Sequence, residues 1–266
     1  MHESTLENNM NGKTALVTGG ARGIGRAIVL KLASQGTNVI INYFRNGDTA
    51  RETVELATSL GVEAHSFKAN VGDPKKIKQM FDWVRNEIGY LDILVNNAAS
   101  GIQRPVLELE PNHWDWTLDI NARGPLLCSK EAAPLMDGRG GRIVNISSLG
   151  STRVMADYAA VGVSKAALEA LTRYLAVELA PKGIVVNAVS GGLVSTGALE
   201  HFPKRDQMLN KAKQETPAGR LVTEDDLAQV VAFLCSDAAD MIIGQTIIVD
   251  GGMSHYWATA LGSDNA

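Results

Sequence analysis

Residues 14–25 read TALVTGGARGIG, an apolar run followed at once by a loop that contains Gly19, Gly23 and Gly25. The apolar run predicts a strand, and the residues after the loop predict a helix near 24–35. Glycines at these places permit a tight turn and let backbone N–H groups and the helix N-terminus approach a pyrophosphate. Glycine spacing alone also fits a generic strand-to-helix turn, so the context of the stretch decides its meaning.

Outward from this stretch, short runs rich in Val and Ile alternate with longer helical patterns. Several runs are apolar without alternation, as expected of strands covered on both faces. The pattern predicts an α/β fold in one domain, a Rossmann-type, doubly wound parallel sheet of seven strands with helices on both faces. The expected strands are 14–18, 38–42, 63–67, 93–95, 142–146, 184–188 and 246–249, and the expected helices lie near 24–35, 47–60, 74–88, 112–136, 158–180 and 223–236.

The domain is expected to cover 12–255, with one irregular insertion. Regular periodicity is lost between Leu193 and Leu221, and a long irregular segment in a compact domain is often a lid or a binding loop. We therefore expect a substrate-binding loop at about 193–220. Residues 1–11 are polar and lack the apolar core of a signal peptide, so we interpret them as a disordered leader. Residues 256–266 are interpreted as a C-terminal tail.

The composition excludes several classes of protein. The 266 residues carry a net charge of −4 and no long Lys/Arg run, which gives no support for nucleic-acid binding. No apolar stretch approaches the ~18 residues that a membrane span needs. Cys128 and Cys235 are too few for a disulfide framework, and no Cys/His cluster indicates a metal. We expect a cytoplasmic protein without a metal.

The glycine loop has the spacing TGxxxGxG, which resembles the short-chain dehydrogenase/reductase family. Further segments resemble motifs of that family in the same order, over about residues 12–253. Two of them depart from the usual pattern, with Ala99 in place of glycine and Gly191 in place of proline. The segments are NNAA at 96–99, Asn121 within DIN, Ser148 within ISS, NAVSGG at 187–192 and GQTIIVDGG at 244–252.

The resemblance implies a nicotinamide cofactor, and the end of the second expected strand indicates which one. A site for NAD usually offers a carboxylate there, but no acid follows until Asp48. Arg45 at this point and Arg22 in the glycine loop could clamp a 2′-phosphate, although both could also be solvated surface charges. We therefore expect NADPH. The full set of expected cofactor-binding residues is Gly19, Ala21, Arg22, Gly23, Ile24, Gly25, Arg45, Asn70, Val71, Asn97, Ala98, Ala99, Lys165, Gly191, Gly192 and Val194.

Tyr158 stands seven positions before Lys165 in the segment DYAAVGVSK at 157–165. Residues at this separation lie on one face of a helix, so both side chains could point into one cleft. A nearby ammonium would favour the phenolate and make the tyrosine a better acid. Alone, the segment also fits a helix with an ordinary tyrosine and an ordinary surface lysine.

Ordinary members of the family carry the tyrosine four positions before the lysine, where this chain has Val161. The displaced tyrosine resembles the enoyl-acyl-carrier-protein reductases of the family, most of all the NADPH-dependent type III bacterial group. Conjugate reduction builds charge on a thioester oxygen, and a donor moved by one helical turn, about 5.4 Å, can reach that more distant atom. The resemblance implies reduction of the C2=C3 bond of a trans-2-enoyl thioester of acyl carrier protein or coenzyme A, as in fatty-acid elongation.

Roles for individual residues follow from the resemblance. Tyr158 would donate a hydrogen bond or proton to the enolate oxygen, and Lys165 would bind the ribose hydroxyls and lend positive charge. Ser148 either contacts the substrate oxygen or is a structural hydroxyl. Asn121 is expected to fix a helix distortion or a water in a proton path. The expected catalytic residues are thus Tyr158, Lys165, Ser148 and Asn121, and the expected substrate-binding residues are Ser100, Tyr158, Leu199 and Phe202.

Several interpretations stay open. Apolar residues of the 193–208 segment suit a fatty tail but equally a short helix packed on the core. Basic residues (Arg104, Lys204, Arg205, Lys211 and Lys213) could meet an acidic carrier protein or could be solvated charges. The resemblance suggests a homotetramer, or a dimer, built on the helices 112–136 and 158–180. The alternatives to enoyl reduction are a 3-ketoacyl or other carbonyl reductase of the family and, more remotely, a non-catalytic NADPH-binding protein.

Overall fold

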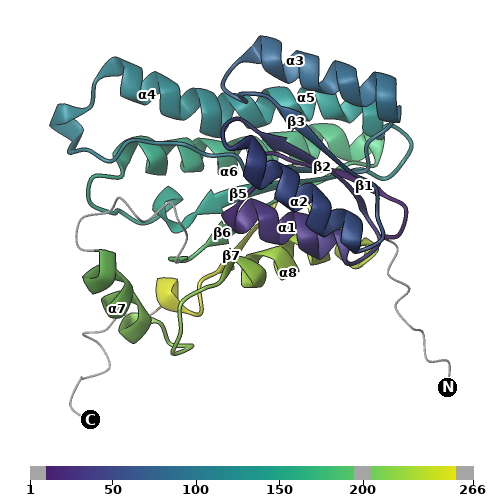
Figure 1. The fold of residues 1–266 in the computed structure, drawn as a ribbon. Coiled ribbons are helices and arrows are strands. Elements are labelled where there is room, and N and C mark those ends of the chain that lie inside the picture. The colour runs from purple at the N-terminus through teal and green to yellow at the C-terminus, as the bar shows by residue number, and fades with distance from the viewer. Residues whose placement is uncertain (1–9, 195–204, 256–266) are drawn as a thin grey trace, which may run out of the picture.

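The computed structural model describes residues 10–194 and 205–255. Its seven parallel strands form one sheet in the order β3-β2-β1-β4-β5-β6-β7 (Figure 1). β1 pairs with β2 on one side and with β4 on the other, so the strand order reverses there. Ligands of open α/β sheets bind at such a switch point, beyond the carboxyl ends of the strands. The strands are β1 (Thr14–Val17), β2 (Asn38–Tyr43), β3 (Ala64–Lys68), β4 (Ile93–Asn96), β5 (Arg142–Ser148), β6 (Val185–Gly191) and β7 (Thr246–Val249).

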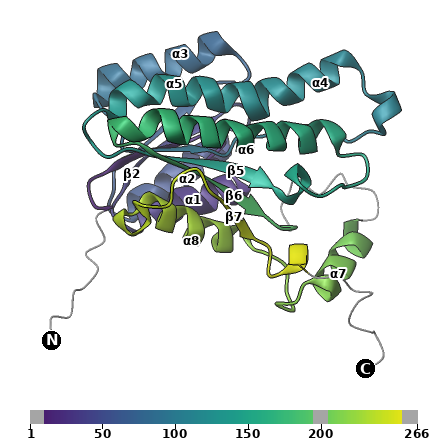
Figure 2. The ribbon, with the colours of Figure 1, turned by 180° about the vertical axis from the view of Figure 1, so that it is seen from behind.

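Helices cover both faces of the sheet (Figures 1 and 2). One face carries α1 (Gly23–Ala33), α2 (Gly47–Ser59) and α8 (Glu224–Cys235). The other carries α3 (Pro74–Trp83), α4 (Pro111–Leu118), α5 (Gly124–Met136) and α6 (Ala159–Leu179). Two apolar clusters form the core, one beneath each helical layer. The predicted doubly wound fold and its seven strands are confirmed.

The local sequence explains where two of the helices begin. Asp73 caps α3 by accepting a 2.9 Å hydrogen bond from the backbone N–H of Lys75, and Pro74 occupies the first helical position. Thr223 and Asp226 form a reciprocal capping box at the start of α8. These caps hold the ends of helices that pack against the sheet.

The structure corrects three expectations. The helix expected at 112–136 is divided by a π-helical turn at Asp119–Arg123. The segment expected to be irregular contains helix α7 (Arg205–Glu215), which is rich in helix-forming residues but lacks an apolar stripe, so its periodicity is weak. Met10 is buried in the core and its carbonyl accepts a hydrogen bond from the Thr37 hydroxyl, so the expected leader does not extend through residues 10 and 11.

Within the described ranges, 10–194 and 205–255, no helix has both the length and the apolar character to cross a membrane.

Candidate active site

The loop between β1 and α1 lies too close to its neighbours for side chains at two positions. A Cβ atom added to Gly25 would lie 2.2 Å from the carbonyl oxygen of Gly19, and one added to Gly19 would lie 3.0 Å from Cα of Ala98. Gly23 has a φ of +54° and open space where a Cβ would point. No side chain caps α1 at Arg22, so the first N–H groups of the helix can bind an anion. The loop therefore fits the pyrophosphate of a dinucleotide.

Hydrogen bonds from three other elements hold this loop in place. The Arg26 guanidinium and the Thr53 hydroxyl each donate a 3.1 Å hydrogen bond to the carbonyl of Ala21. Arg26 is itself paired with Glu52 at 2.8 Å. The buried Asn42 side chain accepts a 3.3 Å hydrogen bond from the N–H of Gly19. The glycine motif did not identify these supporting residues, because they lie outside residues 18–25, which form the motif.

Asn97, expected beside the cofactor ribose, holds the glycine loop against β4. Its side-chain amide donates to the carbonyls of Thr18 at 2.9 Å and Gly19 at 3.1 Å. The Thr18 hydroxyl in turn accepts 3.0 Å hydrogen bonds from the backbone N–H groups of Asn97 and Ala98. Contact of Asn97, Ala98 or the exposed Ala99 with a cofactor stays a prediction.

The two arginines expected to bind a 2′-phosphate lie at the carboxyl ends of neighbouring strands. Arg22 precedes α1 and Arg45 follows β2, and both side chains are exposed. The Arg45 guanidinium lies 5.6 Å from the ring centre of Phe44. No acidic residue stands between the end of β2 and Arg45. Two arginines at this edge fit a ribose 2′-phosphate better than a ribose 2′-hydroxyl.

The remaining expected cofactor residues lie in the loops after β3 and β6. Asn70 accepts a 3.0 Å hydrogen bond from the N–H of Gly72, and Val71 beside it is buried. Gly191 ends β6, and a Cβ on Gly192 would lie 3.0 Å from Cα of Asp250. Val194 forms an isolated bridge with Val222. Loop ends from β1, β2, β3, β4 and β6 thus meet at the same edge of the sheet.

Tyr158 immediately precedes α6 instead of beginning it. Its ring lies on the backbone of Gly150, where an added Cβ would come within 2.5 Å of the Tyr158 Cε1 atom. Burial raises the pKa of the Tyr158 phenol, and a hydrogen bond with the Ser148 hydroxyl opposes this rise. The expectation that Lys165 lowers the pKa of Tyr158 is wrong. Burial raises this pKa, and the group that opposes the rise is Ser148 rather than Lys165.

Lys165 is buried in α6, with 5% of its surface exposed, and its ammonium donates a 2.7 Å hydrogen bond to the carbonyl of Ile146 in β5. Burial lowers the pKa of Lys165 to about 8, and the carboxylate of Glu169 opposes this fall. Glu169 accepts a 2.6 Å hydrogen bond from the Ser147 hydroxyl. Sequence reasoning missed Glu169, although it stands one helical turn after Lys165 and therefore on the same face of α6.

Val161 occupies the position where ordinary family members carry the tyrosine, and its surroundings leave little free space. A Cβ added to Gly101 would lie 2.1 Å from the Val161 Cγ2 atom. Val161 is buried, so its methyl group packs directly on the backbone of the loop after β4. No proton donor stands at this point.

Asn121 lies fully buried in the π-helical turn, so it does occupy a helix distortion. Its side chain accepts from the N–H of Ser100 at 2.9 Å and donates to the carbonyl of Ser100 at 2.8 Å and to the Ser164 hydroxyl at 2.9 Å. The Ser100 hydroxyl accepts a 2.9 Å hydrogen bond from the Trp116 indole. These bonds tie the loop after β4 to α6, and substrate contact by Ser100 stays a prediction.

Two expected substrate-binding residues, Leu199 and Phe202, lie outside the described residues, as do Ala198 and Lys204.

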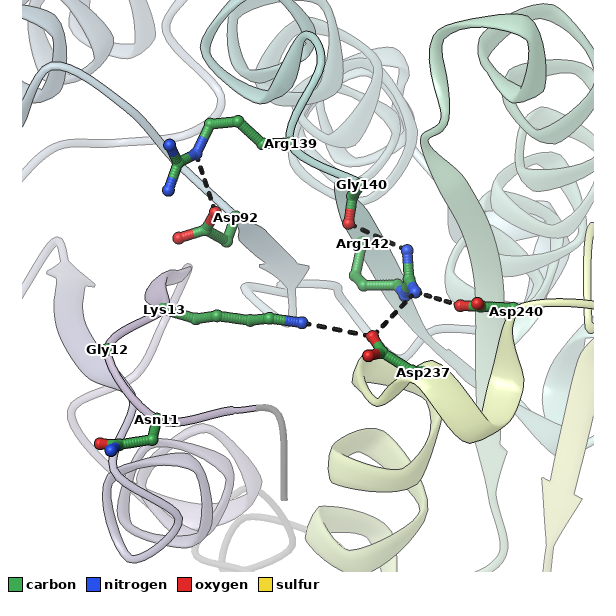
Figure 3. Close-up of a pocket in the computed structure, with 9 residues that line it drawn as sticks. All are labelled: Asn11, Gly12, Lys13, Asp92, Arg139, Gly140, Arg142, Asp237 and Asp240. Carbon is green, nitrogen blue, oxygen red and sulfur yellow. Dashed lines mark hydrogen bonds and ion pairs between the residues drawn. The ribbon is translucent and has the colours of Figure 1, made fainter. Parts of the chain in front are cut away.

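A cavity of about 510 Å³ lies at the opposite, amino-terminal edge of the sheet (Figure 3). Ion pairs cross it, with Lys13 on Asp237, Arg139 on Asp92 and Arg142 on Asp240. It contributes nothing to the site around Tyr158.

Comparison with known proteins gives the same family over most of the chain. A family model described as enoyl-(acyl carrier protein) reductase matches residues 19–254. The 1-cyclohexenylcarbonyl-CoA reductase of Streptomyces collinus is 41% identical over 244 residues, which cover 91% of this chain and 87% of that protein. The 3-oxoacyl-(acyl-carrier-protein) reductase of Staphylococcus aureus is 38% identical over 242 residues, covering 91% and 98%. The solved structure of a Serratia marcescens short-chain dehydrogenase/reductase mutant is 35% identical with a TM-score of 0.86, covering 92% and 99%.

These relatives do not single out one branch of the family, because some are named for reduction beside a thioester and others for reduction of a 3-oxo group. They agree on oxidoreductase activity and on the fold. The loop that fits a dinucleotide, the Tyr158–Ser148 pair and the buried Lys165 lie at the edge of the sheet where such activity resides. The chain is an oxidoreductase that belongs to the short-chain dehydrogenase/reductase family.

Proposed function

We propose that the protein reduces the C2=C3 bond of trans-2-enoyl thioesters with NADPH. The observation that supports the proposal most is the position of the tyrosine that would donate the proton. Val161 fills the ordinary tyrosine position with a methyl group packed on Gly101, and Tyr158 carries the phenol instead, hydrogen-bonded with Ser148. Conjugate reduction develops its negative charge on the thioester oxygen, away from the carbon that accepts hydride, so a displaced donor suits it.

A second candidate is NADPH-dependent reduction of 3-oxoacyl thioesters, and the names of the relatives favour it. Besides the Staphylococcus aureus protein, an Aquifex aeolicus relative that is 38% identical over 252 residues is named a 3-oxoacyl-(acyl-carrier-protein) reductase. The Streptomyces collinus relative, named for a substrate with a ring double bond next to a thioester carbonyl, favours the first candidate. On names alone the second candidate fits at least as well. The position of Tyr158 is our reason for placing enoyl reduction first.

In this mechanism NADPH, when bound, supplies the hydride. The glycine loop and the N-terminus of α1 would hold its pyrophosphate, and Arg22 and Arg45 would hold its 2′-phosphate. Lys165 would donate to ribose hydroxyls and contribute positive charge. The close-packed glycine loop and the two exposed arginines fit the phosphates of NADPH.

Tyr158 would act at the substrate oxygen. Its raised pKa keeps the phenol protonated at neutral pH, so it can donate to the oxygen as enolate charge develops. The Ser148 hydroxyl would stabilise any phenolate that forms. The enolate would then take a proton from solvent at C2, which completes the saturated thioester. Where Tyr158 has transferred its proton to the oxygen, the resulting enol would return that proton as C2 gains one. The intact arrangement of Tyr158, Ser148 and Lys165 weighs against a non-catalytic, NADPH-binding role.

The substrate test follows NADPH oxidation with crotonyl-coenzyme A and longer trans-2-enoyl thioesters beside acetoacetyl-coenzyme A, each also offered on acyl carrier protein. We expect kcat/KM to be higher for the enoyl substrates. Turnover of the 3-oxoacyl compounds alone would reject enoyl reduction and establish the second candidate. Each product should be two hydrogens heavier than its substrate, and chromatography beside butyryl-coenzyme A and 3-hydroxybutyryl-coenzyme A standards identifies the bond that changed.

Replacing Arg45 by alanine should weaken NADPH binding much more than NADH binding. A lost charge-assisted contact of about 1.5–3 kcal/mol corresponds to about a 10- to 150-fold rise in Kd for NADPH, whereas NADH has no 2′-phosphate to lose. Fluorescence titration of both cofactors measures the change. Arg51→Ala is the matched control, because Arg51 is a highly exposed arginine on the adjoining helix α2 that pairs with Asp48. An equal loss for the two cofactors would rule out a 2′-phosphate role for Arg45.

The homotetramer suggested by the family resemblance stays a prediction. The cytoplasmic location expected from the composition also stays a prediction.

A further inference from the structure

Two buried charges lie one turn apart on the same face of α6. Lys165 is 5% exposed and Glu169 is 9% exposed. A buried charge is costly unless it is paired or hydrogen-bonded, yet Glu169 takes no part in the reduction steps described above. Its carboxylate accepts from the Ser147 hydroxyl at 2.6 Å, while Lys165 donates to the neighbouring carbonyl of Ile146 at 2.7 Å. Consecutive residues of β5 therefore hold both groups.

We propose that Glu169 is a positioning residue for Lys165: fixed by Ser147, its carboxylate keeps the buried Lys165 ammonium protonated and available at the carboxyl end of β5. The inference rests on the proposed function, because it assumes that Lys165 binds the ribose hydroxyls of NADPH. Glu169 itself would touch neither cofactor nor substrate.

The other charged groups around α6 do not replace Glu169. Glu169 is the one charged group among the described residues that acts on the pKa of Lys165. Of the neighbouring groups Arg142 and the Cys128 thiol on α5 are buried. Arg142 lies at the far end of β5 in an ion pair with Asp240, and burial raises the pKa of Cys128, so this thiol carries no charge at neutral pH. β6 and the turn Leu149–Ser151 carry no titratable group. The groups on the remaining neighbours are His113 and Asp115 on α4, Asp119 and Arg123 on the π-helical turn, Lys130 and Glu131 on α5, Lys182 after α6, and Arg173, Tyr174 and Glu178 on α6 itself, with Tyr158 preceding it.

The proposal gives a definite sign for the pH dependence. Burial lowers the pKa of Lys165 to about 8 and Glu169 opposes that fall. As pH rises through this value the ammonium loses its proton, and NADPH affinity should fall. Without the carboxylate the same loss should begin at a lower pH, because burial is then unopposed.

The test measures the Kd for NADPH from about pH 6 to pH 10 in the full-length protein, for wild type and for Glu169→Gln. A pKa lowered by one unit would weaken binding about tenfold well above the pKa and by less than about twofold well below it. Gln keeps the length of the side chain and an oxygen that can accept from Ser147, so the fold should persist. Glu169→Met, which removes the charge and leaves no buried amide, decides the matter if the Gln variant does not fold. Glu178→Gln, at an exposed position of α6, is the matched control.

The outcomes separate this inference from the proposed function. Displacement of the alkaline limb to lower pH in a Glu169 variant, with wild-type behaviour in Glu178→Gln, supports the inference. A uniform loss of affinity at every pH, or an unchanged profile, overturns it even if wild type reduces enoyl thioesters with NADPH. Failure of wild type to bind NADPH would instead overturn the proposed function. Because the readout is cofactor binding, the identity of the thioester does not affect the result.

Discussion

Tyr158→Phe should lower kcat about 10²- to 10⁴-fold, the usual range for removal of a general acid. The Kd for NADPH should change less than about twofold, because the ring is retained and the cofactor loop lies in other elements. In the proposed mechanism the phenol beside Ser148 is the proton donor, and Val161 offers no substitute. Stopped-flow measurement of NADPH oxidation, with a separate binding titration, checks both halves of the prediction.

Tyr174→Phe is the matched control for this substitution. Tyr174 lies in α6, the helix that Tyr158 precedes, and is 71% exposed, so loss of its hydroxyl should leave kcat unchanged. Full activity of Tyr158→Phe would show that another group donates the proton. A large rise in the Kd for NADPH would show that the phenol supports cofactor binding rather than chemistry.

Gly25→Ala should weaken NADPH binding and destabilise the fold. The added Cβ would lie 2.2 Å from the Gly19 carbonyl oxygen and 2.5 Å from the Asn97 amide nitrogen, and the first of these is backbone that cannot rotate away. Overpacking of this kind costs about 1–3 kcal/mol, and if the loop moves to relieve it, NADPH affinity should fall about 5- to 150-fold. Thermal unfolding and fluorescence titration measure the two effects.

Gly47→Ala provides the comparison for stability. Gly47 begins α2, and a Cβ there would meet the Tyr43 ring at 3.7 Å, an ordinary contact distance. Its Tm should stay close to that of wild type. If Gly25→Ala leaves both Tm and NADPH affinity unchanged, the loop can accommodate a methyl group at position 25 and the prediction is wrong.

The sheet could be predicted because its signals are local. Each buried strand is a short apolar run, and the glycine loop marks a junction where backbone passes close to backbone. The spacing between Tyr158 and Lys165 likewise needs no knowledge of packing. Helix α7 was missed for the opposite reason, since its helical character lies in residue propensity and not in an apolar stripe.

The partners of the proposed catalytic residues could not be predicted, because they depend on how β5 packs against α6. Nothing in the sequence places the Ile146 carbonyl under Lys165, or the Ser147 hydroxyl at Glu169. The same limit explains Tyr158: its distance from Lys165 along the helix suggested a lowered pKa, whereas burial raises it. Spacing identifies which residues share a face, but only packing decides how deeply they are buried.

The contact between Val161 and Gly101 makes two distant positions of the chain interdependent. With valine at 161, any side chain at 101 collides with it, although the backbone at 101 would accept alanine. Substitutions at the two positions should therefore show strong epistasis, each tolerated or not according to the residue at the other. A tyrosine placed at position 161 would have to be accommodated by the loop after β4 as well as by α6. The residue at position 101 therefore limits which residues position 161 can hold.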